Sequence, residues 1–393
     1  MSVLFIGGII SKVNQAEIIE NAKGYAEFSA NIFQEKLIKG FKENEIELNI
    51  ISAPFIGAYP FKYKKMFFRS FKEKQDEYTY VPFNNIFGYR NFSRAASLKR
   101  AIKKLVLKEN KKFDLILAYS AHEPFLEAAV YAKKLLPNSK ICFVVPDLPQ
   151  YMNLDANRPK MYDFLKRIDI KRMNRLITAV DSFVILTEPM KDMLQVGFRP
   201  YIVAEGIIAS LPKAYSEINQ ATSDIKTVVY TGKMNMAFGI KELVDSFMEI
   251  EGENYRLVLC GDGDAKEYVL QKAQEDNRID YRGQVSPDEA KRVVENASVL
   301  VNPRPNDSEY TKYSFPSKNI EYLMSGKPVV TYMLGGMPEK YSEFIYTADC
   351  NISLKDAMIN ALNGENKEKY RAFCNYASRH LTAKNIVSEI MRL

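Results

Sequence analysis

The sequence predicts an α/β protein built from two parallel-sheet domains. Three features support this: the length, a regular alternation of strand-like and helix-like segments, and a polar stretch that interrupts it midway. At 393 residues the chain is too long for one core, and the length favours two domains of about 150 to 200 residues each. Apolar residues make up 47% and charged residues 26% of the chain, which is ordinary for a globular protein.

In the first half, short runs rich in Val, Ile and Leu alternate with segments of helical spacing. The expected order is a strand at 2–10, a helix at 27–44, a strand at 46–53, strands in KKFDLILAYS and SKICFVVPD around a helix at 123–135, and a helix end and strand in RLITAVDSFVILTEPM. Such βαβ alternation predicts a parallel sheet covered by helices on both faces.

The alternation restarts after a turn-like stretch at 206–225. Strands are expected in KTVVYTGKM, YRLVLCGDGD, NRIDYRGQV, ASVLVNPRP and KPVVTYM, with helices at 239–250 and 264–276. We therefore place one Rossmann-like domain at 1–205 and a second at 206–374. An amphipathic helix at 375–393 has no obvious place, and packing back on the first domain is one option. Ligands are expected in a cleft between the domains, where strands end.

Composition excludes several kinds of site. Only two His residues are present, and the four Cys residues show no CxxC or CxH spacing, so neither a metal site nor a disulfide framework is expected. The reducing cytoplasm is the simplest compartment. The apolar N-terminus reads as a buried strand, and no run is long enough to span a membrane. The net charge of +7 suits an anionic partner.

One stretch departs from the pattern. Residues 61–74 interleave Phe, Tyr and Met with Lys and Arg, and 94–112 add a second basic run. They read either as solvated helix faces or as a surface that rests on anionic lipid. No nucleic-acid-binding signature is present.

The segment 299–330 carries the chemistry that is easiest to interpret. A strand ends at Pro303 and a helix is expected from about Pro316, with Ser314 or Ser317 near its cap. Its N-terminus would attract an anion. Lys318 in the first turn opposes the helix dipole unless an anion such as phosphate lies beside it. Glu321 lies one turn further on the same face, so an i,i+3 salt bridge on an ordinary helix is the alternative.

FPSKNIEYLMSGKPVV resembles the donor-site helix of glycosyltransferase family 4, in the variant with a Pro-Ser-Lys turn. YTGKMNMAFGIKELVDSF, YRLVLCGDGD and IDYRGQVSPDEA resemble further segments of that family in the same order, and AEGII resembles its interdomain strand. The resemblance implies a GT-B fold, with two Rossmann-like domains facing a cleft. It also implies retention of anomeric configuration, no obligatory metal or cofactor, and a nucleoside diphosphate sugar as donor.

The resemblance also implies roles for single residues. Glu321 would bind the nucleotide ribose; Gly283 and Val285 would border the base. Lys233, which follows Gly232, would neutralise the donor diphosphate together with the helix start at Pro316, Ser317 and Lys318. Neutralising the leaving group is where such an enzyme gains most. We add Arg304 as a further phosphate clamp; the alternative is a loop arginine in solvent.

Two positions depart from the family's pattern: Tyr313 replaces a Glu, and Phe238 replaces a Lys. We hypothesise that Lys318 supplies the missing positive charge. In the first domain, Asp147 and His122 follow strands. Asp147 is a catalytic candidate that could orient the acceptor or the donor sugar, with helix capping or loop fixing as the alternative. His122 could reach the acceptor, with a simple capping role as the alternative. Asp262 and Asp264 fit a cap-and-turn role better than a metal site.

The predicted function is transfer of a sugar from a nucleoside diphosphate to a hydroxyl acceptor by a hexosyl- or glycosyltransferase. The acceptor would be lipid-linked or a growing bacterial polysaccharide if residues 61–74 touch the inner face of the membrane. Rivals are a non-catalytic GT-B partner protein that binds a glycan or protein, favoured by Tyr313 and Phe238, and a GT-B epimerase, disfavoured by the scarcity of His. The base, the sugar, the acceptor and the oligomeric state are not encoded in recognisable motifs.

Overall fold

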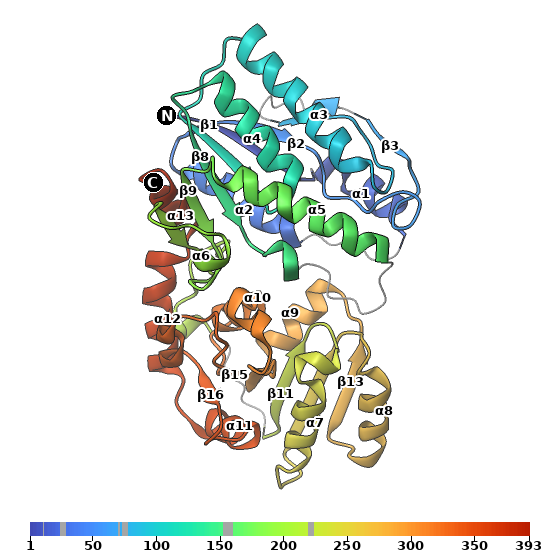
Figure 1. The fold of residues 1–393 in the computed structure, drawn as a ribbon. Coiled ribbons are helices and arrows are strands. Elements are labelled where there is room, and N and C mark those ends of the chain that lie inside the picture. Colours follow the sequence, from blue (N-terminus) through green and yellow to red (C-terminus); the bar gives the residue numbers. More distant parts are fainter. Residues whose placement is uncertain (11, 24–28, 70, 73–77, 152–159, 219–223) are drawn as a thin grey trace. The chain divides into compact units, whose positions relative to one another are not determined.

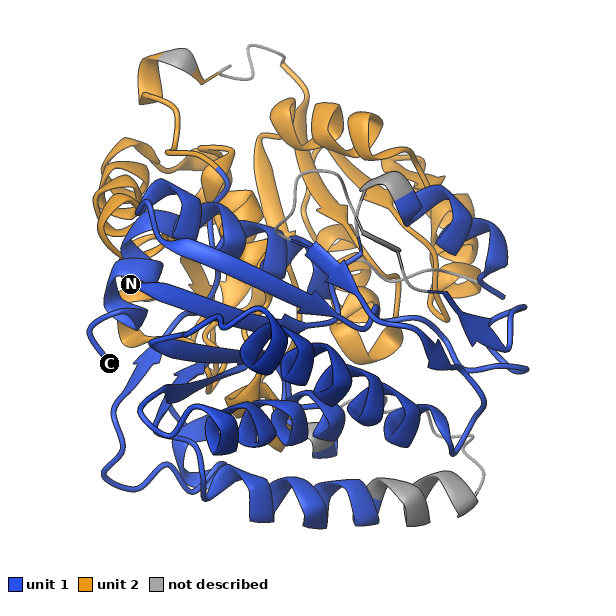
Figure 2. Cartoon of the chain, turned by 90° about the horizontal axis from the view of Figure 1, so that it is seen from above, with its two compact units in different colours: residues 1–209, 382–393 blue, residues 210–381 orange. Residues whose placement is uncertain are grey.

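A computed structural model of the chain describes residues 1–393 except 11, 24–28, 70, 73–77, 152–159 and 219–223. The chain divides into two compact units. Unit 1 comprises residues 1–209 and 382–393, and unit 2 comprises residues 210–381 (Figure 2). Both units consist of a sheet flanked by helices (Figure 1).

Unit 1 is built on a mainly parallel sheet in the order β10-β9-β8-β7-β1-β2-β5-β4. Its strands are β1 (Ser2–Gly7), β2 (Glu47–Ser52), β4 (Phe71–Lys72), β5 (Tyr78–Tyr80), β7 (Leu115–Tyr119), β8 (Lys140–Val145), β9 (Ser182–Ile185) and β10 (Tyr201–Val203). Only β4, at one edge, pairs antiparallel among the described strands of this sheet. A separate antiparallel pair joins β3 (Phe67–Phe68) to β6 (Phe83–Asn84).

The helices of unit 1 cover this sheet. They are α1 (Lys12–Asn21), α2 (Ser29–Glu43), α3 (Arg90–Lys103), α4 (Glu123–Leu135), α5 (Lys160–Ile177), α6 (Met190–Met193) and α13 (Ala383–Ile390). The central strands β1, β7 and β8 are buried almost end to end, as expected for a sheet covered on both faces.

Unit 2 contains a six-stranded parallel sheet in the order β13-β12-β11-β14-β15-β16, counted over its described residues. Its strands are β11 (Lys226–Thr231), β12 (Tyr255–Cys260), β13 (Ile279–Gly283), β14 (Val299–Asn302), β15 (Val329–Tyr332) and β16 (Tyr346–Ala348). Its helices are α7 (Ile240–Met248), α8 (Lys266–Glu275), α9 (Pro287–Glu295), α10 (Ser317–Met324), α11 (Leu354–Asn363) and α12 (Lys367–His380).

This strand order is that of a doubly wound fold, in which the chain reverses direction across the sheet between β11 and β14. Ligands of such folds bind beyond the carboxyl ends of the strands at this switch point. Apolar side chains of α7, α8 and α11 pack with the sheet into one core, which includes Val228, Phe247 and Met358. The core fixes the strands whose ends carry the candidate site.

The predicted fold class is confirmed, but the expected single helix at 375–393 is wrong. The chain forms two helices there, because α12 ends at His380 and Thr382 caps a new helix by accepting a hydrogen bond from Asn385 N (3.2 Å). The second helix, α13, packs on α2 of unit 1, where Asn44 Nδ2 donates to the carbonyl of Lys384 (2.9 Å).

The expected helix faces in the basic stretch are also partly wrong. Residues 61–69 form turns and strand β3 rather than a helix, while 70, 73 and 74 lie outside the described residues. The second basic run does lie in α3 and in a π-helical turn at Lys104–Lys108.

Candidate active site

Three strand ends of unit 2 are joined by main-chain hydrogen bonds beyond the sheet itself. Gly232 N donates to the carbonyl of Cys260 (2.9 Å), and Gly261 N donates to the carbonyl of Gly283 (2.7 Å). Gly261 has φ +146°, and a β-carbon there would lie 1.7 Å from the carbonyl oxygen of Gly232. The loops after β11, β12 and β13 therefore pack closely enough to require glycine.

Lys233 follows β11 at this edge, and its side chain is exposed. Its main chain is held because the Tyr230 hydroxyl donates to its carbonyl oxygen (2.8 Å). Burial raises the pKa of Tyr230 to about 12, so the phenol keeps the proton that it donates. The ammonium group is thus presented from a fixed loop at the carboxyl end of the sheet.

Arg304 follows β14, the strand next to β11. Its guanidinium lies 4.7 Å from the ring centre of Tyr310 and 5.6 Å from that of Phe238, and Nη2 donates to Ser314 Oγ (3.1 Å). Its Nε is buried and has no hydrogen-bond partner within the described residues. Arg304 is therefore held between two rings and is not a loop arginine in solvent.

Phe238 reaches Arg304 because the chain turns sharply after it. Residues Met236–Phe238 form a 3-10 turn that ends at Gly239, whose φ is +80°. A β-carbon on Gly239 would lie 2.0 Å from the carbonyl oxygen of Pro303, so the loops after β11 and β14 touch here. Tyr313 ends a second 3-10 turn that begins at Glu309.

Helix α10 begins where the sequence predicts, but its cap differs. Pro316 is the N-cap residue, and no side chain caps the helix. Ser317 is the first helical residue, and Ser314 instead accepts from Arg304. Ser317 therefore lies next to the cap residue as expected, although neither serine caps the helix with its side chain.

Two buried side chains fasten α10 to the strand ends. The Tyr322 hydroxyl accepts from Thr231 N (2.8 Å) and donates to its carbonyl (3.2 Å), and Asn302 Nδ2 donates to Asn319 Oδ1 (2.6 Å). Asn319 directly follows the Pro-Ser-Lys turn and Tyr322 comes three residues later, yet sequence reasoning missed both. They fix the N-terminus of α10 beside the ends of β11 and β14.

Lys318 and Glu321 form an ion pair with each other. Lys318 Nζ lies 2.9 and 3.0 Å from the two carboxylate oxygens of Glu321, and both side chains are partly or largely exposed. The i,i+3 salt bridge is thus present. Exposed pairs of this kind contribute little stability. An anion that binds Lys318, or a hydroxyl that binds Glu321, can therefore break the pair at little cost in free energy.

The remaining predicted donor residues lie along the same sheet edge. Gly283 ends β13 with φ +67°, and Val285, two residues on, is partly buried. Asp264 Oδ1 accepts from Met236 N (2.7 Å), which fixes the loop after β11. Ala265 is the N-cap residue of α8, so Asp264 has the expected turn role without the expected capping role. The described residues contain no cluster of three or more His, Cys, Asp or Glu arranged to hold a metal.

The candidate acceptor residues lie in unit 1 at the ends of β7 and β8. Asp147 is exposed, and burial together with the charge of Asp147 raises the pKa of Tyr119. His122 occupies the N-cap position of α4, as the capping interpretation predicts, but its side chain makes no cap hydrogen bond. Its ring instead contacts Phe55 (5.2 Å between ring centres) and Phe125 (6.3 Å).

Burial, followed by the charges of Arg94 and Arg90, lowers the pKa of His122 to about 3. At neutral pH the imidazole is therefore uncharged. It can accept or donate a hydrogen bond but adds no positive charge at this end of the sheet of unit 1.

Replacing His122 with glutamine is expected to reduce the loss in the free energy of unfolding that accompanies a fall in pH. The unfolded chain protonates this histidine at an ordinary pKa of 6.5, whereas the folded chain does so only near 3. The contribution of His122 to the free energy of unfolding is therefore fully present above pH 6.5 and is lost as the pH falls. At pH 5 the loss is about 2 kcal/mol. Urea unfolding of unit 1 at pH 7 and pH 5 measures it. His380→Gln, at the other histidine, should lose as much stability between pH 7 and pH 5 as the wild type does. An equal loss in His122→Gln would contradict the role given to His122.

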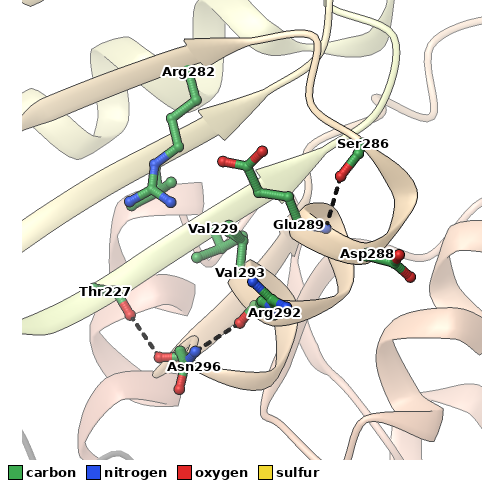
Figure 3. A pocket seen from close by; sticks show the side chains of 10 residues that line it. Thr227, Val229, Arg282, Ser286, Asp288, Glu289, Arg292, Val293 and Asn296 are labelled. Carbon is green, nitrogen blue, oxygen red and sulfur yellow. Dashed lines mark hydrogen bonds between the residues drawn. The ribbon is translucent and has the colours of Figure 1, made fainter.

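A pocket of about 640 Å³ lies elsewhere in unit 2, between α9 and the face of the sheet (Figure 3). Its lining combines the apolar side chains of Val229 and Val258 with the charged side chains of Arg282 and Glu289. Asn296 closes one end, where its Nδ2 donates to the carbonyl of Arg292 (2.8 Å). None of the predicted site residues lines it.

Comparison with known proteins identifies a family to which part of unit 2 is similar. The family model described as "Glycosyl transferases group 1" matches residues 225–364, which include the strand ends at Lys233, Gly283 and Arg304 and the start of α10. The fold of the chain is that of GT-B glycosyltransferases, and residues 225–364 resemble a glycosyltransferase family.

Solved structures with the same fold cover the whole chain. A lipopolysaccharide outer core galactosyltransferase, WaaB, is 15% identical with TM-score 0.62, covering 100% of this chain and 99% of its own. Sucrose-phosphate synthase from Thermosynechococcus elongatus is 12% identical with TM-score 0.62, covering 100% and 98%. HepE from Anabaena in complex with UDP is 12% identical with TM-score 0.58, covering 100% of both chains. No curated protein sequence matches the chain.

Proposed function

We propose that the chain is a retaining glycosyltransferase of family 4 that moves a sugar from a nucleoside diphosphate to a hydroxyl acceptor. Unit 2 binds the donor and unit 1 the acceptor. The observation that carries this proposal is the gathering of two cations, Lys233 and Arg304, and the helix start at Pro316 around the switch point of the six-stranded sheet. Positive groups fixed at this point suit a diphosphate.

The proposed chemistry follows from charge. The bond from the sugar to the diphosphate breaks towards an oxocarbenium-like sugar and an anionic leaving group, and Lys233 stabilises that anion without needing a metal. Arg304 is aligned before the donor arrives, since Phe238, Tyr310 and Ser314 already hold it. The unpartnered Nε of Arg304 leaves a donor for an incoming oxygen.

The remaining donor contacts belong to the same proposal. Ser317 and Lys318 bind the diphosphate, with Lys318 leaving Glu321 to do so, and Glu321 then accepts from the ribose. Gly283 and Val285 border the base. The comparison structure of HepE was solved with UDP, which supports a nucleotide at this kind of fold without identifying the base here.

The acceptor is proposed to be a lipid-linked saccharide or a growing bacterial polysaccharide, reached from the inner face of the membrane. Asp147 and His122 are the acceptor-side candidates. No described helix is both long enough and apolar enough to cross a bilayer. The proposal includes peripheral membrane contact through residues 61–74.

A thermal-shift screen of nucleoside diphosphate sugars tests the proposal, followed by product analysis with the best hit. A donor at one hundred times its Kd should stabilise the protein by about 2.7 kcal/mol, enough to raise Tm by several degrees.

The Lys318–Glu321 pair, with Phe238 and Tyr313 in place of charged residues, favours one alternative: a non-catalytic partner that binds a glycan or protein. Absence of a shift with every sugar nucleotide would support that alternative.

A further inference from the structure

Two segments of unit 1 lie side by side and expose large apolar side chains. Residues 61–69 contain β3, and residues 83–92 contain β6 and the start of α3. The two strands pair at Phe67 and Asn84, and Asn85 N donates to the carbonyl of Met66 (2.7 Å). Rings also meet across the segments, with 5.5 Å between the ring centres of Phe61 and Phe87. The segments therefore form one continuous surface.

We call the outward side of these segments the basic-aromatic face, and it has two kinds of side chain. Its exposed apolar members are Phe61 (67% exposed), Met66 (50%), Phe67 (47%), Ile86 (37%), Tyr89 (52%) and Phe92 (56%). Its exposed cations are Lys62, Lys64, Lys65 and Arg69. Lys65 pairs with Glu17 (2.6 Å), and Lys64 Nζ donates to the carbonyl of Glu20 (2.7 Å).

The exposure is built into the fold. Tyr63, Phe68 and Phe83 on the inner side are buried, and the last two stack with 5.1 Å between their ring centres. Strand β3 alternates, so that burying Phe68 forces Phe67 outward. Single exposed apolar residues need no explanation, but six on two paired segments form a patch of the kind that marks an interaction site.

We propose that the basic-aromatic face binds the surface of an anionic phospholipid membrane, with the aromatic side chains entering the headgroup boundary and the lysines and Arg69 contacting lipid phosphates. Interleaved cations and aromatic side chains match the chemistry of that boundary, where apolar groups meet negative charge. This deepens the proposed function, because it identifies where an enzyme with a lipid-linked acceptor would rest. The surface consists of two paired segments rather than the helix that the sequence suggested.

Co-sedimentation of the full chain with vesicles tests the proposal. The wild-type protein should bind vesicles of phosphatidylcholine with about 30 mol % phosphatidylglycerol at least about tenfold more tightly than phosphatidylcholine alone, and added salt should weaken that binding. A triple variant, Phe61→Ser, Met66→Ser and Phe67→Ser, should lose at least about tenfold in partitioning. Because these side chains are exposed, its circular dichroism and Tm should remain those of the wild type.

A matched control comes from the same unit. Phe198 is fully exposed on another loop, at 110%, and Phe198→Ser should bind vesicles like the wild type. Lys62→Glu with Arg69→Glu should abolish the preference for the anionic vesicles. Equal wild-type binding to both vesicle types, or equal losses in the triple variant and in Phe198→Ser, would overturn the proposal. Donor-induced thermal shifts report on the proposed function separately, so either can fail alone.

Discussion

Lys233→Ala is expected to lower kcat by about two to three orders of magnitude, the range found when one preorganised group facing a developing oxyanion is removed. The ammonium group projects from a loop that Tyr230 and the neighbouring strand end already fix. Its loss therefore removes charge stabilisation at the leaving diphosphate without disturbing the fold. Steady-state kinetics with the donor found in the thermal-shift screen measures the effect.

Two comparisons make this result specific. Lys291→Ala, at an exposed lysine of α9, should leave kcat unchanged. Lys318→Ala should also lower kcat if Lys318 leaves Glu321 to bind the diphosphate. Full activity of Lys318→Ala would remove Lys318 from the mechanism, while full activity of Lys233→Ala would contradict the proposed donor site itself.

Gly261→Ala is expected to destabilise unit 2 by about 2 to 4 kcal/mol. The added β-carbon would lie 1.7 Å from the carbonyl oxygen of Gly232, and the φ of +146° is unfavourable for alanine. Gly232 cannot move away easily, because its N–H is bonded to the carbonyl of Cys260. Differential scanning calorimetry should show a fall of roughly 5 to 15 °C in the transition of unit 2.

Gly283→Asn is the matched control for stability. Gly283 also has a positive φ, of +67°, but nothing lies within 4 Å of a β-carbon there, and asparagine tolerates this conformation. The substitution should change Tm little. If both variants unfold at the wild-type temperature, the result would contradict the close contact between Gly261 and the carbonyl of Gly232.

The parts of the fold that the sequence predicts well are those set by periodicity. Buried parallel strands read as short apolar runs, and the helices between them show one apolar face. The break between α12 and α13 escaped this reasoning because apolar spacing continues through Leu381. The signal was local: Thr382 is a good N-cap residue, and such caps are too common to mark every helix start.

The candidate site was predicted only in part, for a different reason. Residues that directly follow strands, such as Lys233 and Arg304, can be placed from the strand pattern, since parallel strands end at one edge. Tyr310, which lies against Arg304, is part of the 3-10 turn that begins at Glu309, and the position of that turn depends on tertiary packing. The Lys318–Glu321 contact follows from helical spacing, yet spacing alone does not decide between an ion pair and a ligand site.

The chain leaves unit 1 after residue 209 and re-enters it at residue 382. These two points are joined by a parallel β-bridge between Ile208 and Thr382. Lys36 and Lys39 of α2 donate to the carbonyls of Ile207 and Ala209 nearby, and Gly40 allows α13 to lie against the same helix. Unit 2 is thus an insertion in the covalent order of unit 1. A fragment that stops at residue 209 would lack α13 and would leave the surface of α2 uncovered. A short peptide that joins residue 209 to residue 382 would restore α13 to unit 1. Unit 2 needs no such joining peptide, because residues 210–381 form one continuous segment.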